Sequence, residues 1–143
     1  MSTTAPLQKH HKLCDELFAG AEEACAKGDW AQGARSFARL REQLEAHFVS
    51  EEELLFPAFE EATGMASGPT EVMRGEHAQM RELLEQMAGA LAAQDDDAFG
   101  GSAETLLILM QQHNVKEENI LYPMCDNVLG GTGIGADLQA RLG

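Results

Sequence analysis

Two segments of the sequence place a histidine four residues before a glutamate and continue in the same pattern. They read HFVSEEELLFP (residues 47–57) and HNVKEENILYP (residues 113–123). Residues four apart on a helix lie on one face, one turn apart, so the histidine and the glutamate of each pair can share a metal ion. A single pair of this kind is usually a helix-surface feature, but two copies with matched spacing predict a metal site. The paired residues are His47 with Glu51 and His113 with Glu117.

The two segments are copies in a longer internal repeat with an offset of 66 residues. The same offset places His11 on His77, so that a lone histidine precedes each pair by 36 residues. Counted from the turn that each copy contains, the lone histidine and the paired histidine lie at nearly the same depth along their helices. The four histidines should therefore meet in one layer.

The nature of these side chains indicates which metal they would bind. Glutamate on an apolar helix stripe is costly to bury unless it is paired or bound to a cation. Four imidazoles and two carboxylates suit Fe, Mn or Zn rather than a thiolate site. Two carboxylates at the centre of a bundle suit two ions bridged by Glu51 and Glu117, with two histidines on each ion.

Several neighbouring residues leave alternatives open. His10 also lies near the stripe, but the repeat favours His11, which leaves His10 as either a surface residue or a support for the site. Glu52 and Glu118 either face solvent or orient ligands. The repeat pairs Tyr122 with Phe56, and we expect both to be core aromatics, with contact to the site as the alternative for Tyr122.

The elements that would position these residues are helices. Apolar residues recur at spacings of three and four in four segments, and no segment of useful length has a strand period. Asp29 and Asp95–Asp97 can cap helices, residues 63–70 have the composition of a loop, and Pro57 should kink or end the helix before it. In the last segment Leu106, Met110, His113, Glu117, Ile120 and Leu121 should face inward. The first helix is expected over about residues 5–27 and the third from residue 69 or 70 to 93. The second follows Asp29, and the fourth follows Asp95–Asp97 and has Pro123 near its end.

Long helices with short connections predict an all-α fold, an antiparallel up-down-up-down four-helix bundle made of two pseudo-repeated helical hairpins. We expect the bundle to occupy residues 5–130. Residues 131–143 form a Gly-rich tail in which a short helix is conceivable.

These residues resemble the hemerythrin-like HHE cation-binding family from about Leu7 to Val128. The resemblance rests on the first-helix histidine, on the two segments above and on GEHAQMRELL from residue 75. Residues 65–77 are also similar to bacterial di-iron proteins that repair iron–sulfur centres. The family implies a non-haem di-iron site, oxo- or hydroxo-bridged. Zn or Mn can substitute for iron, because the same N and O ligands bind those ions. Its ligand positions match His11, His47, Glu51, His77, His113 and Glu117.

One position departs from the family pattern. Oxygen-carrying members have a further histidine four residues before the third-helix ligand, and Met73 stands there. The site then offers four histidines rather than five, unless His10 also binds. The sequence therefore gives less support to reversible oxygen storage. Fewer protein ligands leave more room at the metal for water or a small oxidant.

Composition excludes several classes of function. The chain has 143 residues and a net charge of −14, with 10 basic against 24 acidic residues, which argues against nucleic acid as a partner. No apolar run approaches the length of a membrane span. Three cysteines without a CxxC pair fit a reduced, cytoplasmic protein.

We therefore expect a protein that binds or senses O2, NO or a related small oxidant. One alternative is a di-iron enzyme acting on peroxide, NO or ferrous iron. Another is iron storage or donation, including the repair of iron–sulfur centres. The sequence does not identify the small ligand, a protein partner or the oligomeric state.

Overall fold

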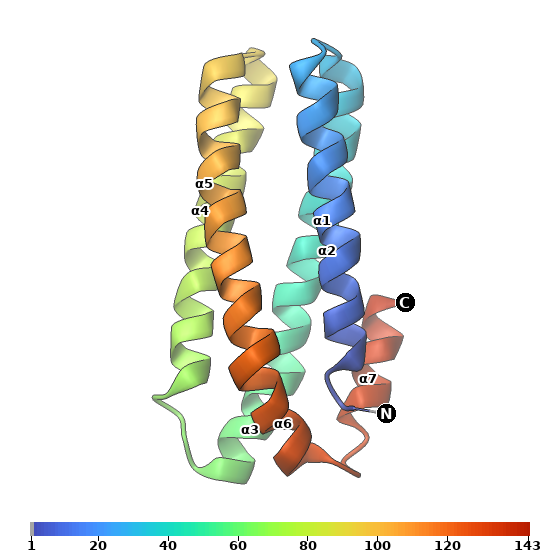
Figure 1. The fold of residues 1–143 in the computed structure, drawn as a ribbon, viewed down its shortest axis with the longest axis vertical. Coiled ribbons are helices and arrows are strands. Elements are labelled where there is room, and N and C mark those ends of the chain that lie inside the picture. The colour runs from blue at the N-terminus through green and yellow to red at the C-terminus, as the bar shows by residue number, and fades with distance from the viewer. Residues whose placement is uncertain (1) are drawn as a thin grey trace.

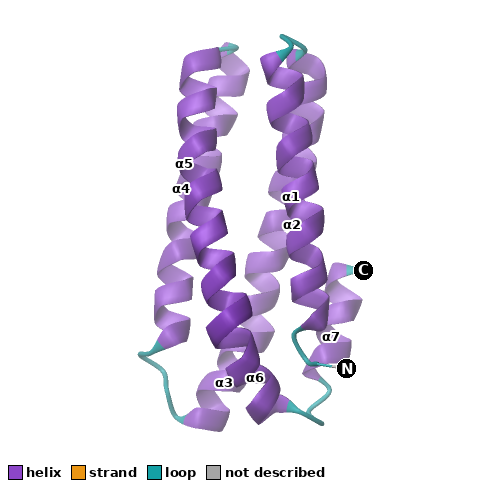
Figure 2. Cartoon of the chain, in the orientation of Figure 1, coloured by secondary structure: helices purple, strands orange, loops and turns teal. Residues whose placement is uncertain are grey.

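The structure is a computed structural model that describes residues 2–143, and every regular element in that range is a helix (Figure 2). Four long helices lie side by side along the longest axis of the molecule (Figure 1). They are α1 (Ala5–Ala26), α2 (Trp30–Ser50), α4 (Pro69–Ala93) and α5 (Asp96–Lys116). The protein is thus a helical bundle, as the sequence predicts.

Short capped turns connect the long helices within each half of the chain. The Asp29 carboxylate accepts a hydrogen bond from the backbone N–H of Gln32, and the Asp95 carboxylate accepts one from Ala98. Each aspartate thereby satisfies a free N–H at a helix start. The turn before Asp29 contains Gly28 at a φ of 78°, a conformation that favours glycine. Pairing within each half is extensive, α1 with α2 and α4 with α5, and gives two helical hairpins.

The second helix of each hairpin changes its winding at the glutamate of the metal-site pair. A five-residue π-helix follows α2 (η1, Glu51–Leu55) and another follows α5 (η2, Glu117–Leu121). Each is continued by an eight-residue α-helix, α3 (Phe56–Thr63) or α6 (Tyr122–Leu129). The regular α-helix thus ends before each proline, at Ser50 and Lys116, and Pro57 and Pro123 lie in the first turn of α3 and α6, where the chain remains helical.

The prediction that Ile120 faces inward is wrong. Its side chain is 57% exposed, whereas Leu121 and Tyr122 are buried. In η2 the backbone N–H of Tyr122 donates to the carbonyl of Glu117, five residues back. The wider turn moves the inward positions from three and four residues after Glu117 to four and five residues after it.

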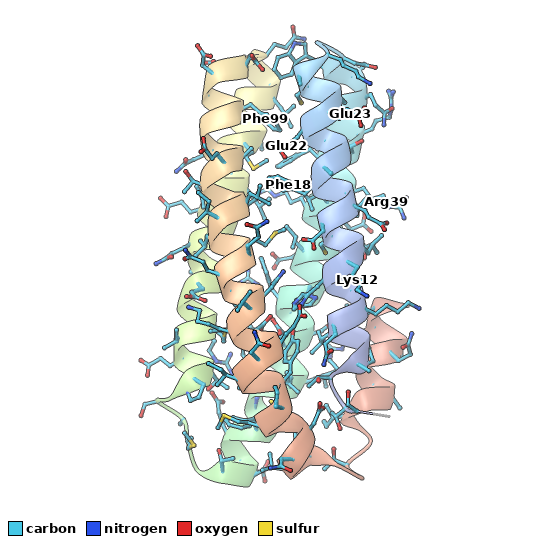
Figure 3. The ribbon with its side chains drawn as sticks, viewed as in Figure 1. Lys12, Phe18, Glu22, Glu23, Arg39 and Phe99 are labelled. Carbon is cyan, nitrogen blue, oxygen red and sulfur yellow. The ribbon has the colours of Figure 1, made fainter. Side chains whose placement is uncertain are left out.

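The interior has two apolar clusters with a polar layer between them. The larger contains Phe18, Phe48 and Phe99, and the smaller contains Leu55 and Phe56. Figure 3 shows Phe18 and Phe99 between the helices, while Lys12 and Arg39 lie on the outside. Along α1 the order is Leu7 of the smaller cluster, then His11, then Cys14 of the larger. The predicted metal ligands thus separate the two clusters.

The C-terminal residues form a further helix, α7 (Ile134–Leu142), which packs beside α1 and α2 (Figure 1). Its Leu138 is fully buried and belongs to the smaller apolar cluster. None of the helices within residues 2–143 is long and apolar enough to cross a membrane.

Candidate metal centre

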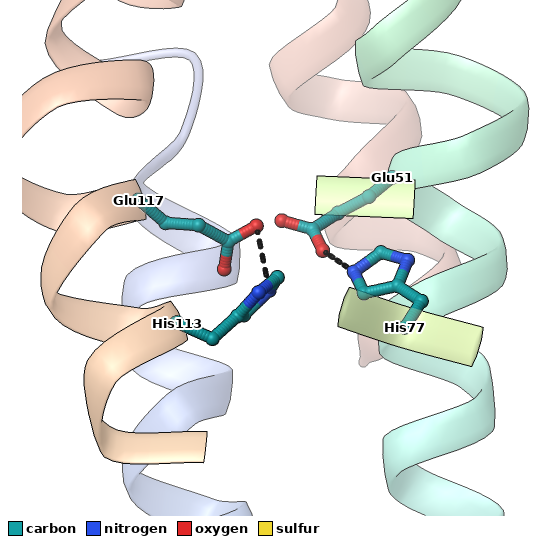
Figure 4. A group of neighbouring side chains, drawn as sticks. All are labelled: Glu51, His77, His113 and Glu117. Carbon is teal, nitrogen blue, oxygen red and sulfur yellow. Dashed lines mark hydrogen bonds and ion pairs between the residues drawn. The ribbon is translucent and has the colours of Figure 1, made fainter. Parts of the chain in front are cut away.

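The structure brings all six predicted ligand residues together in two groups of buried donors. Within each group the donor atoms lie within 4.8 Å of one another, and Glu117 belongs to both groups. Figure 4 shows the larger group, with the two carboxylates facing each other across the bundle. The larger group is Glu51, His77, His113 and Glu117, and the smaller is His11, His47 and Glu117.

All four histidines turn Nε2 toward a carboxylate of the centre. His77 Nε2 lies 3.0 Å from Glu51 Oε1, and His47 Nε2 lies 3.6 Å from the same oxygen. The Glu117 carboxylate is shared in the same way, with Oε1 at 3.2 Å from His11 Nε2 and Oε2 at 3.3 Å from His113 Nε2. Both glutamates therefore face histidines from both hairpins, which is the position that a bridging carboxylate requires.

The donor set fits a metal ion. Glu51, Glu117 and His77 have no exposed surface, although a carboxylate is rarely fully buried without a partner. His113 Nε2 and Glu117 Oε2 are buried and have no hydrogen-bond partner among the described residues. Buried polar atoms without partners are uncommon and costly, and a cation between these two atoms would satisfy both.

Three of the histidines donate from Nδ1 to a carboxylate on their outer side. His11 donates to Glu118 at 2.7 Å and His77 donates to Glu52 at 2.8 Å. Retention of the Nδ1 proton leaves the Nε2 lone pair free for a metal and fixes the orientation of the ring. The alternative that Glu52 and Glu118 merely face solvent is therefore excluded. The third pair is His113 with Glu76, at 2.8 Å.

His10 supports the fourth histidine and is not one of the converging donors. Its Nδ1 lies 2.9 Å from His47 Nδ1, and its Nε2 lies 2.9 Å from Gln43 Oε1. The amide oxygen of Gln43 is an acceptor, so the His10 proton is on Nε2 and His47 donates to His10 Nδ1. His10 is only 4% exposed, which rules out the surface alternative. Burial also lowers its pKa, which keeps the ring neutral.

Tyr122 reaches the centre as well as filling the core. Its hydroxyl donates to Glu51 Oε2 at 2.6 Å and lies 3.0 Å from Glu117 Oε1. It also lies 3.3 Å from His11 Nε2 and 3.4 Å from His47 Nε2. Its counterpart Phe56 stacks on His77 and has no polar group to offer the centre. Both residues are core aromatics as expected, and for Tyr122 the alternative of contact with the site holds as well.

The electrostatics of the centre are those of carboxylates held close to imidazoles. Burial would lower the pKa of His77, but hydrogen bonds to Glu51 and Glu52 outweigh it and raise that pKa to about 9. The pKa of His11 is raised to about 8 because Glu117 and Glu118 outweigh burial in the same way. Burial opposes ionisation of Glu51, yet its histidine neighbours hold its pKa well below the usual value. The imidazoles thus keep the buried Glu51 carboxylate ionised, which is the form that binds a cation.

Comparison with known protein families shows to which family this chain belongs. The family described as "Hemerythrin HHE cation binding domain" matches residues 3–125, which is most of the chain. This chain belongs to that family. The resemblance seen in the sequence is thus confirmed, and a helical, iron-related, metal-binding domain is the established reading of the fold and of the His/Glu cluster.

The hemerythrin-like chain is also similar to curated bacterial proteins. It is 32% identical over 93 residues to the iron-sulfur cluster repair protein YtfE of Escherichia coli O81 (strain ED1a), and 31% identical to the protein of that name in Escherichia fergusonii. Each match covers 59% of this chain and 42% of the relative, so the chain spans less than half of the length of these relatives. No solved structure matches.

Two residues that orient ligands in this hemerythrin-like domain were missed in the sequence. Glu76 accepts from His113 and also pairs with Lys116. Arg81 binds the Glu52 carboxylate from Nη1 at 2.8 Å and from Nη2 at 2.9 Å. The repeat could have indicated Glu76, because Glu76 corresponds at the 66-residue offset to His10, a possible support for the site. No comparable signal exists for Arg81, whose counterpart is Asp15.

Proposed function

We propose that this protein holds two non-haem iron ions and binds or senses a small oxidant such as O2, NO or peroxide. The ligands would be the six residues predicted from the repeat, with two histidines on each ion and Glu51 and Glu117 bridging. They would sit in an antiparallel up-down-up-down four-helix bundle spanning residues 5–130. The observation that carries the proposal is the pair of His113 Nε2 and Glu117 Oε2, which lie buried 3.3 Å apart without a hydrogen bond to either atom.

The surrounding chain has the features that such a centre needs. Imidazole and carboxylate donors suit iron and also Zn or Mn. Bound iron would supply coordination positions and electrons for a small ligand. The two apolar clusters exclude water from above and below, and the carboxylates behind the histidines hold the rings in place. The three cysteines are buried and unpaired, which supports a cytoplasmic location.

Metal content tests the first part of the proposal. The purified chain is reconstituted anaerobically with ferrous iron and desalted, and its iron is measured together with the absorption spectrum. We expect about two iron atoms per chain, as in other carboxylate-bridged bundle sites. Glu51→Gln should hold less than half of this, whereas the exposed control Glu61→Gln should be unchanged. Absence of bound iron in the unmodified chain would refute the proposal.

Exposure of the loaded, reduced protein to O2, NO or hydrogen peroxide tests the second part. A change in the near-ultraviolet and visible bands that is stoichiometric with protein indicates binding, and sustained consumption of the ligand indicates an enzyme. No spectral change with any of the three would remove the small-ligand proposal while leaving the metal site intact.

Iron–sulfur cluster repair is a second candidate, favoured by the similarity to the repair protein YtfE. Repair would require the chain to release iron to an acceptor. The loaded protein, carrying isotope-labelled iron, is mixed with an apo iron–sulfur protein, and the label in the acceptor is measured. Transfer faster than from free ferrous iron at the same concentration supports repair, and the absence of transfer contradicts it.

A further inference from the structure

The two halves of the centre are not equivalent, although the repeat relates them. We call the position between His77 and His113 the 77/113 position, and that between His11 and His47 the 11/47 position. The repeat keeps the six converging residues and also Glu52 and Glu118, which stand behind His77 and His11, but it is broken at two other residues beside the centre. At the 66-residue offset, His10 corresponds to Glu76 and Tyr122 corresponds to Phe56.

The first difference is the number of donors that converge. Four residues present donor atoms at the 77/113 position, including both glutamates, and three do so at the 11/47 position. The Tyr122 hydroxyl stands at the 11/47 position, 3.3 Å from His11 Nε2 and 3.4 Å from His47 Nε2, and it donates to Glu51 Oε2 at 2.6 Å. Phe56 offers no such competitor on the other side. A metal entering the 11/47 position must therefore displace a hydrogen bond, which costs affinity.

The second difference is the group that accepts the Nδ1 proton of the α2 or α5 histidine. His113 donates to the carboxylate of Glu76, which Lys116 holds in place. His47 donates to the neutral ring of His10, which Gln43 holds in place. A carboxylate acceptor raises the basicity of the ligating nitrogen more than a neutral imidazole does. His113 should therefore be the stronger ligand.

Charges farther from the centre favour binding of a cation at the 11/47 position, but only weakly. Arg81 and Lys116 stand near the 77/113 position, whereas Asp15 stands near the other. These three groups are partly or largely exposed, so water screens them, while the Nδ1 partners touch the ligands directly. The direct contacts should decide the order of binding.

We propose that the metal positions fill in sequence, the 77/113 position first and more tightly, and the 11/47 position second and more weakly. This inference rests on the proposed two-metal site. His10 acts through His47 and is a positioning residue. Loss of an outer partner of a metal ligand typically changes metal affinity by about ten- to a hundredfold. We expect the two dissociation constants to differ by at least about tenfold on the same basis.

Titration of the metal-free, full-length chain with Co²⁺ tests the order. Calorimetry gives the affinity of each step, and the visible spectrum of Co²⁺ reports the ligand environment as each position fills. Two steps of unequal affinity are expected. Two steps of equal affinity would overturn the inference but support the two-metal site. No binding would overturn the proposed function itself.

Two substitutions taken from the repeat assign the steps. His10→Glu gives His47 the same kind of acceptor as His113 and should tighten the second step by about tenfold without changing the first. Glu76→Gln gives His113 a neutral acceptor and should weaken the first step by a similar factor. Glu42→Gln, on the exposed face of α2, is the control and should change neither step.

The variants His10→Glu and Glu76→Gln test the order of filling independently, so one of them suffices if the other is unstable. Circular dichroism and thermal melting show whether each variant folds, and Glu76→Gln buries no new charge. If Glu76→Gln weakens the second step, or if His10→Glu folds and leaves the second step unchanged, the assignment of positions is wrong.

Discussion

At the scale of single residues, Tyr122 links the two carboxylates of the centre. Its hydroxyl lies 2.6 Å from Glu51 Oε2 and 3.0 Å from Glu117 Oε1, and all three side chains are fully buried. The neighbouring carboxylates and the lack of water raise the pKa of Tyr122 well above its usual value, so the hydroxyl keeps its proton and donates it. In the metal-free protein this donor replaces part of the charge compensation that a cation would provide.

Tyr122→Phe should therefore destabilise the metal-free protein more than the metal-loaded one. A hydrogen bond to a charged group contributes about 1.5–3 kcal/mol, and we expect a loss of that order in the free energy of unfolding without metal. With iron bound, the carboxylates have the metal as a partner and the loss should be smaller. Urea unfolding of both forms measures the difference. Equal losses in the two forms would show that the hydroxyl does not compensate the carboxylates.

The raised pKa values of His11 and His77 predict how the stability of the metal-free protein depends on pH. Both lie above the ordinary value of 6.5, at about 8 and about 9. The protonated rings stabilise the folded state below pH 6.5, and this contribution is lost as pH rises through 8 and 9. Metal-free protein should thus lose at least about 1 kcal/mol between pH 6.5 and 9, since one pKa unit corresponds to about 1.4 kcal/mol.

The urea midpoint at several pH values measures this effect, with His77→Gln as the matched variant. The variant should have a flatter profile over the same range, because one of the two titrating rings is gone. A profile that rises toward pH 9 in the unmodified protein would contradict the assignment of charged imidazoles to the metal-free state.

The residues that converge on the centre could be predicted from the sequence, and their supports only in part. The His–Glu spacing and the 66-residue offset identify the six side chains because helix geometry relates spacing to direction. The partner of His47 could not be derived in this way. His10 and His11 are neighbours in the chain, and only the packing of α1 against α2 shows which ring faces the centre and which faces Gln43.

At the scale of elements, each π-helix leaves backbone groups that need partners outside the helix. Pro57 has no N–H, so the carbonyl of Glu52, five residues earlier in η1, has no helical donor. Arg74 of α4 donates to this carbonyl at 3.4 Å and also to Glu60 Oε1 at 3.3 Å. Its guanidinium lies 5.3 Å from the ring centre of Phe56. One side chain thus fastens η1 and α3 to the opposite hairpin.

Arg74→Met should lower the free energy of unfolding by about 1 kcal/mol, the typical contribution of a hydrogen bond of this kind. Methionine keeps the packing over Phe56 and removes the donors. Arg39→Met, at an exposed position on α2, serves as control and should have little effect. If thermal or urea unfolding places both variants at the same stability, the contact from Arg74 is not what holds η1.

The starts of the long helices and the ends of α1 and α4 were predictable, whereas the ends of α2 and α5, where the π-helices begin, were not. Capping aspartates, glycines and the apolar period mark the predictable points. A π turn adds one residue without changing composition, so the apolar pattern around Ile120 reads as an ordinary α-helix. The error of one residue at Ile120 is the expected consequence of the wrong helical period.

At the scale of the whole molecule, α7 covers the side of the bundle on which His10 lies. A surface pocket of about 200 Å³ separates α1 from α7, with His10 and Lys9 on one wall and Gln139 and Leu142 on the other. Leu138 is fully buried against the smaller apolar cluster. The residues of α7 lie beyond the stretch that matches the family, which ends at residue 125.

Leu138→Ala should therefore destabilise the entire protein and not only its terminal helix. Removal of a fully buried leucine side chain costs about 2–5 kcal/mol. Gln139→Ala, one residue later and exposed, should cost much less. Thermal unfolding followed by circular dichroism measures both. A single transition shifted to lower temperature places α7 in the same cooperative unit as the bundle, and an unshifted main transition would contradict this.

The second glutamate of each motif reaches across to the other hairpin, since Glu52 holds His77 and Glu118 holds His11. Neither hairpin can thus orient its own lone histidine. A half-length chain that contained one hairpin could complete the centre only by pairing with a second copy related by a twofold axis. The two hairpins therefore depend on each other for the orientation of their lone histidines, although the residues behind the paired histidines, His10 and Glu76, differ between the two halves.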